Sequence, residues 1–187
     1  MSDFEFIFAL FGLLLGLSLA EVLAGLARAI EAKLIQGAAV KIGWLTPLLA
    51  AFVLLDLLSF WQAAWINRDI VEVSGRTLMV VMIFAGAYYL AASLVFPKSI
   101  GERTDFDDHF FRVRRIVLGV MLVLLVCQLG WYLSVPARAG LLARPVALGL
   151  TIVLVSLMIA AMVVRGARWS RVAMLALVAR YVVVYLI

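Results

Sequence analysis

The stretch that decides the fold is Ile42–Ile66, which reads IGWLTPLLAAFVLLDLLSFWQAAWI and contains a single charged residue, Asp56. A helix of about 25 residues rises ~38 Å, which is enough to cross the ~30 Å hydrocarbon core of a bilayer. Trp44 lies near one end of the stretch, and Trp61 and Trp65 lie near the other. Tryptophan is enriched at both membrane interfaces, so the stretch predicts a membrane-spanning helix.

Stretches of the same kind recur along the whole chain. The six predicted spans are residues 4–28, 42–66, 77–96, 116–135, 146–164 and 172–187. None alternates polar and apolar residues as a membrane strand would, and open strand edges cannot face lipid. The last span has only about 16 residues, or ~24 Å of helix. Its helix is therefore expected to begin within the preceding basic turn, or else its C-terminus lies shallow in the bilayer.

Composition supports a single membrane domain over residues 1–187. Hydrophobic residues make up 67% of the chain and charged residues 14%, whereas a soluble domain carries about 45–50% apolar and about 25% charged residues. The expected fold is an all-α, polytopic membrane protein, a bundle of six transmembrane helices joined by short loops. The net charge of +5 does not indicate nucleic acid, because the basic residues cluster beside the spans, as membrane topology requires.

The distribution of Lys and Arg predicts the orientation in the membrane. The loops after the first, third and fifth spans carry eleven of these residues, and the loops after the second and fourth carry four. Cytoplasmic loops are enriched in Lys and Arg. We therefore expect both termini outside the cytoplasm. The chain as a whole resembles an integral protein of a bacterial inner membrane, which is the expected location.

Three ionisable residues lie at membrane depth: Glu21, Asp56 and Arg180. A charge at the centre of a membrane helix costs about 2.5–3.5 kcal/mol, so such residues normally face protein or water. Asp56 and Arg180 are both expected near the midplane, and Glu21 lies ~9 Å from it toward the cytoplasm. Two interpretations stay open at this point. The residues line a route for an ion or proton, or Asp56 and Arg180 form a buried ion pair that joins two helices.

The first span carries small residues at four-residue spacing, Gly12, Gly16, Ala20 and Ala24. Small residues at this spacing lie on one helix face and let two membrane helices approach closely. We expect a close helix contact at this face, either within the chain or between chains.

The third loop contains the chain's one histidine, His109, and a group of aspartates that includes Asp105 and Asp108. These three residues are weak candidates for a metal site, and ordinary helix capping is the favoured interpretation. Thr104 with Asp107 resembles a capping box at the start of the following helix.

No Gly-rich phosphate loop, cysteine pair or HExxH motif is present, so no cofactor or metal is expected. The expected function is that of a small channel or transporter, conducting an ion, a proton or a small solute along a route lined by intramembrane carboxylates. A homo-oligomer or a membrane protein partner is expected. The alternative is a non-catalytic membrane subunit that scaffolds or regulates a partner protein. An enzyme is not favoured, because only the third loop would support one.

Overall fold

The structure is a computed structural model that describes residues 3–70, 72–101, 104–136, 140 and 144–186. Within these residues it contains six long helices and no strand, and each helix is long and apolar enough to span a membrane. The helices are α1 (Asp3–Gln36), α2 (Leu45–Ile66), α3 (Gly75–Ser93), α4 (Phe106–Ser134), α6 (Pro145–Val163) and α7 (Ala167–Leu186). This confirms the all-α fold with six apolar helices, and it makes the chain an integral membrane protein in contact with lipid.

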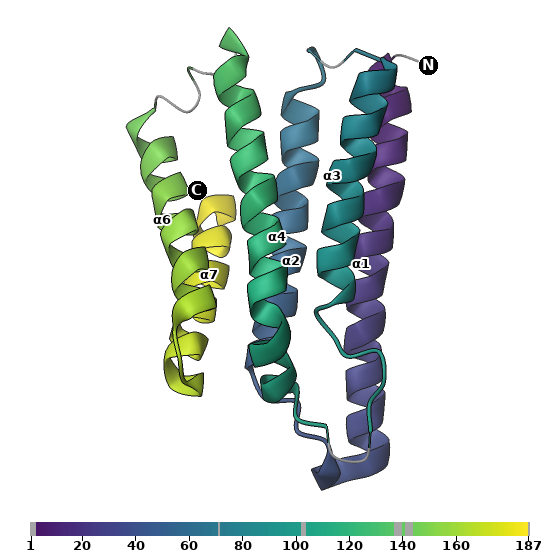
Figure 1. The fold of residues 1–187 in the computed structure, drawn as a ribbon, viewed down its shortest axis with the longest axis vertical. Coiled ribbons are helices and arrows are strands. Elements are labelled where there is room, and N and C mark those ends of the chain that lie inside the picture. Colours follow the sequence, from purple (N-terminus) through teal and green to yellow (C-terminus); the bar gives the residue numbers. More distant parts are fainter. Residues whose placement is uncertain (1–2, 71, 102–103, 137–139, 141–143, 187) are drawn as a thin grey trace.

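The helices run side by side in a flattened bundle (Figure 1). Helix α1 packs against α3 and α2, and α2 packs in turn against α7 and α4. Helices α6 and α7 pack against each other, and α6 also contacts α4. Helices α2 and α4 therefore connect the N-terminal part of the bundle to the C-terminal pair.

Several helices continue beyond the apolar runs that predicted them. Helix α1 has 34 residues, or ~51 Å of helix, so it is about 20 Å longer than a hydrocarbon core. Its end is held by Lys33, whose Nζ donates to the carbonyl oxygens of Gly37 and Val40, both at 2.8 Å. Helix α7 begins at Ala167, inside the basic turn, and thereby reaches 20 residues. Hydropathy marks only the part of a helix that faces lipid, so it misses these polar extensions.

Backbone hydrogen bonds join the segment that precedes α2 to the segment that precedes α4. The Lys41 amide donates to the Thr104 carbonyl at 3.0 Å, and the Phe106 amide donates to the Lys41 carbonyl at 2.9 Å. The Asp107 carboxylate accepts a bond from the Leu45 amide at 3.0 Å, at the first turn of α2. These bonds hold the starts of α2 and α4 side by side, which aligns the two helices that meet at the polar cavity described below.

A close approach of α1 to the segment after α3 occurs at Gly25. A Cβ at this position would lie 2.6–2.8 Å from atoms of the buried Phe96 side chain, whereas a Cβ at Gly16 would meet nothing within 4 Å. We expect Gly25→Ala to lower the free energy of unfolding by about 1–3 kcal/mol, because overpacking forces neighbouring groups to move. Gly16→Ala, the matched control, should be neutral or stabilising by up to about 1 kcal/mol through helix propensity. Thermal unfolding of both variants in detergent checks the prediction, and equal stabilities would contradict it.

Candidate functional site

Asp56 lies near the middle of α2 and is 8% exposed. Its Oδ1 accepts a hydrogen bond from the Tyr181 hydroxyl of α7, and its Oδ2 lies 3.4 Å from the Tyr88 hydroxyl of α3. The Tyr181 ring is held by an edge contact with Phe52, one turn before Asp56, at 5.8 Å between ring centroids. The carboxylate is therefore placed where three helices meet, with a tyrosine from each of the other two.

The two tyrosines do not contribute equally. The Tyr88 hydroxyl also lies 2.7 Å from the carbonyl oxygen of Val53. A hydroxyl has one proton to donate, and the shorter contact takes it. Oδ1 of Asp56 thus has a firm donor in Tyr181, whereas Oδ2 has only the long contact to Tyr88. Oδ2 is consequently the carboxylate oxygen that is free to accept a proton.

Asp56 faces a cavity of about 190 Å³, which we name the Asp56 cavity. Its walls come from α2, α4, α6 and α7, and they combine apolar side chains with carboxylate, guanidinium, amide and hydroxyl groups. The lining residues are Asp56, Ser59, Phe60, Leu125, Gln128, Leu129, Tyr132, Thr151, Leu154, Arg180 and Tyr181.

Arg180 reaches this cavity from α7. Its guanidinium carbon lies 4.8 Å from the centre of the Tyr181 ring, and its Nη2 donates to the Leu150 carbonyl at a long 3.4 Å. Among the residues that the structure describes, its buried Nε has no hydrogen-bond partner. Within the described residues, no ion pair of 4.0 Å or less joins Asp56 to Arg180. The structure therefore brings the two charges to one cavity, but it does not place them in direct contact.

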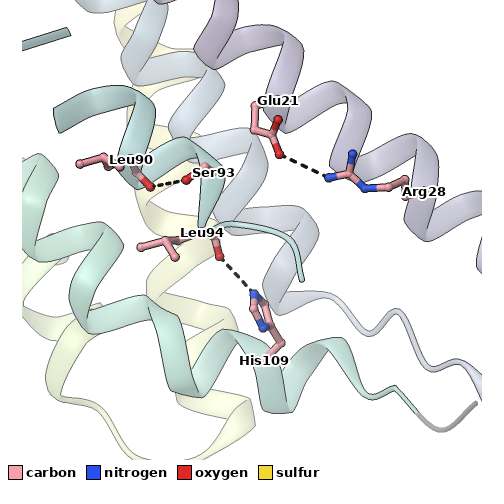
Figure 2. Close-up of polar contacts among 6 residues, drawn as sticks. All are labelled: Glu21, Arg28, Leu90, Ser93, Leu94 and His109. Carbon is pink, nitrogen blue, oxygen red and sulfur yellow. Dashed lines mark hydrogen bonds and ion pairs between the residues drawn. The ribbon is translucent and has the colours of Figure 1, made fainter. Parts of the chain in front are cut away.

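Glu21, the third ionisable residue at membrane depth, lies elsewhere. It pairs with Arg28, two turns further along α1, at 3.4 Å between Oε1 and Nη2 (Figure 2). It is not among the residues that line the Asp56 cavity. A spacing of seven residues places both side chains on one helix face, so the acid has a partner on its own helix.

Of the two glycines of the small-residue face of α1, Gly12 makes a close contact in the described part of the chain. A Cβ at Gly12 would lie 2.9 Å from the Trp61 ring, whereas Gly16, Ala20 and Ala24 lie on the exposed side of the helix. A contact between chains at this face stays a prediction. Gly25, which does make a close contact, lies one residue outside the four-residue series, so the pattern did not select it.

Two of the three weak metal candidates have structural roles. Asp105 caps α4, because its carboxylate accepts a hydrogen bond from the Asp107 amide at 2.9 Å. The imidazole of His109 lies 3.1 Å from the Leu94 carbonyl, next to the end of α3, where the Ser93 hydroxyl donates to the Leu90 carbonyl (Figure 2). Asp108 is exposed. No group of three potential metal ligands occurs in the part of the chain that the structure describes.

The predicted cap at Thr104 is wrong by one residue, because Asp105 is the N-cap of α4. The Thr104 hydroxyl instead donates to the Gly101 carbonyl at 3.0 Å. Asp is the stronger N-cap residue of the two, and the choice between adjacent residues depends on where the backbone turns into the helix.

Arg114 is a buried cation, although it lies between the predicted third and fourth spans, 77–96 and 116–135. It is 4% exposed, and its Nη1 donates to the Ala161 carbonyl at 3.2 Å and to the Ser170 hydroxyl at 3.1 Å. Its guanidinium also lies 4.8 Å from the centre of the Phe111 ring. Arg114 thus joins α4 to the end of α6 and the start of α7. The neighbouring phenylalanines were the one sequence signal, since arginine stacks on aromatic rings.

Comparison with known proteins gives no relative for this chain. No family model matches it, and neither the curated proteins nor the solved structures give a match. The Asp56 cavity is accordingly the feature from which a function is argued.

Proposed function

We propose that this protein is a small membrane channel or transporter and that the Asp56 cavity is part of its route for an ion, a proton or a small solute. One observation carries the proposal. A carboxylate and a guanidinium that are not paired with each other face a common cavity among four apolar helices. A charge at membrane depth is costly, and one that serves only to join helices gains most from direct pairing.

The chemistry of the cavity is suited to transport. A single buried water needs about 10–15 Å³, so a cavity of about 190 Å³ has room for several. Oδ2 of Asp56 lacks a firm donor, so it can take up a proton. The protonated carboxyl would then donate a hydrogen bond to the Tyr88 oxygen, 3.4 Å away. In this proposal Asp56 binds and releases a proton or a cation, and the positive charge of Arg180 sets the electrostatic potential along the route.

We expect Asp56→Asn to reduce flux through the purified protein in liposomes by at least tenfold, because the amide cannot carry the negative charge or exchange a proton. The measurement is the flux of protons and of small ions, with a dye inside the vesicles and an imposed gradient. Asp69→Asn makes the same chemical change at an exposed residue, where Asp69 pairs with Arg68 at 3.5 Å, and it should leave the flux unchanged. Wild-type flux in the Asp56→Asn variant would rule out this route.

The second candidate function is a non-catalytic subunit that scaffolds or regulates a membrane protein partner. The observation in its favour is the end of α1, where Leu34 is 80% exposed and Ile35 is 76% exposed on a helix longer than the hydrocarbon core. Apolar side chains beyond the core of a bilayer are suited to a protein contact. A partner that co-purifies at fixed stoichiometry, together with no flux in liposomes, would favour this function.

We also propose a bacterial inner membrane location with both termini outside the cytoplasm, from the excess of Lys and Arg in the odd-numbered loops. A reporter that is active only outside the cytoplasm should be active when it is fused after Ile187. A cytoplasmic reporter at the same position should be inactive, and a fusion of each reporter in the loop near Lys41 should show the reverse pattern. Activity of the cytoplasmic reporter at the C-terminus would overturn this orientation.

A further inference from the structure

The Asp56 cavity contains hydrogen-bond donors that have no partner among the described residues. A guanidinium has five N–H donors and no acceptor. For Arg180 the structure shows one long bond, from Nη2 to Leu150, and a buried Nε without a partner. Asp56, the one carboxylate among the lining residues, already faces the hydroxyls of Tyr88 and Tyr181.

The neutral groups of the wall follow the same pattern. The Tyr132 oxygen accepts from Nδ2 of Asn67 at 3.2 Å, which leaves its own proton to donate. Nδ2 is identified as the donor because it also bonds to the Ala63 carbonyl at 2.7 Å, and a carbonyl only accepts. Gln128, on the same helix as Tyr132, adds an amide N–H₂ to the lining. Arg180, Tyr132 and Gln128 thus offer donors from two different helices.

From this donor set we infer that the cavity binds a small monovalent anion at Arg180, such as a halide or a small carboxylate. The inference rests on the route proposed above, because it concerns the same cavity: the anion is a counter-ion for Arg180, whereas Asp56 remains the group proposed to bind a proton or a cation. An arginine is always charged, and an unpaired cation at membrane depth is stabilised by a mobile counter-ion. The cavity of about 190 Å³ has room for a small anion.

Two substitutions decide the sign of the ligand, because Arg180 attracts an anion and Asp56 repels it. Arg180→Gln should weaken anion binding at least tenfold. Asp56→Asn should strengthen it by two- to tenfold, since it removes a negative charge from the same cavity. A cation ligand gives the opposite result for both variants. Arg171→Gln is the matched control, because Arg171 is exposed on the same helix, with its Nε bonded to the Ala167 carbonyl at 3.3 Å; it should bind as the wild type does.

The purified full-length chain is titrated in detergent with sodium chloride and with sodium iodide. Calorimetry measures the binding, and thermal unfolding measures the stabilisation by the anion. Sodium gluconate at equal ionic strength is the reference, because gluconate is bulkier and more strongly hydrated than either halide. Saturable binding of the small anions, lost in Arg180→Gln, supports the inference. No saturable binding, or wild-type affinity in that variant, overturns it. Arg180→Lys, which keeps the charge with fewer donors, should retain weaker binding if Arg180→Gln does not fold.

Flux separates this inference from the proposed function. Saturable anion binding without any flux supports the binding site and overturns the route. Proton or cation flux that depends on Asp56, in a protein that binds no anion, supports the route and overturns the anion site.

Discussion

Tyr181→Phe should lower the free energy of unfolding by about 1.5–3 kcal/mol, because it removes the hydroxyl that donates to the buried carboxylate of Asp56. The ring itself remains, so its edge contact with Phe52 is kept. The loss should therefore come from the polar contacts of the hydroxyl rather than from packing. Chemical unfolding in mixed micelles, followed by far-ultraviolet circular dichroism, measures it. Tyr185→Phe is the matched control, because that hydroxyl is on an exposed residue and its bond to the Leu55 carbonyl is long, at 3.5 Å.

A double-mutant cycle tests whether Asp56 and Tyr181 act as one unit. The loss in the double variant Asp56→Ala with Tyr181→Phe should be smaller than the sum of the single losses, by about 1–2 kcal/mol. The same cycle for Asp56 and Arg180 should show weaker coupling, since no ion pair of 4.0 Å or less joins them in the described structure. Strong coupling to Arg180 with none to Tyr181 would contradict this arrangement and favour a direct ion pair.

Arg114→Met should be the most destabilising of the charge-removing substitutions at the end of the bundle where α4 begins, with a loss of about 3 kcal/mol. Two charge-assisted hydrogen bonds are lost, each worth about 1.5–3 kcal/mol. Removal of a buried charge is favourable and offsets part of this loss. Methionine keeps much of the side-chain volume, so packing changes little. The Ala161 carbonyl and the Ser170 hydroxyl lose their donor.

The control for Arg114 is Arg112→Met, two residues earlier on α4, where the side chain is exposed. Its effect should stay within about 0.5 kcal/mol. Ser170→Ala should cost less than Arg114→Met, because it removes one of the two bonds and leaves the other. A stability of Arg114→Met equal to that of the control would show that the arginine does not join α4 to α6 and α7.

Predictions from the sequence were most accurate where they depended on local hydropathy. Each of the six predicted spans corresponds to a helix. A long apolar stretch in lipid must satisfy all its backbone hydrogen-bonding groups internally, and a helix does this. Helix ends were less accurate. The polar turns of α4 before Ile116 follow the hydrogen bonds of Asp105 and Asp107 rather than hydropathy.

The site shows the same division. The depth of Asp56 and of Arg180 follows from their distance along a helix, and the structure places both at one cavity. Their partners did not follow from depth. Tyr88 and Tyr181 were ordinary aromatic residues in the sequence, and Arg114 resembled a topology determinant.

The sequence by itself thus determined the fold class, the number of long apolar helices and which charged residues interrupt them, since these depend on the composition of each segment. The tertiary structure decided which charges meet. Rotation of a helix by one residue turns a side chain by about 100°, and only the packing of neighbouring helices selects that rotation. This is why Glu21 pairs on its own helix with Arg28, whereas Asp56 accepts from a tyrosine 125 residues away.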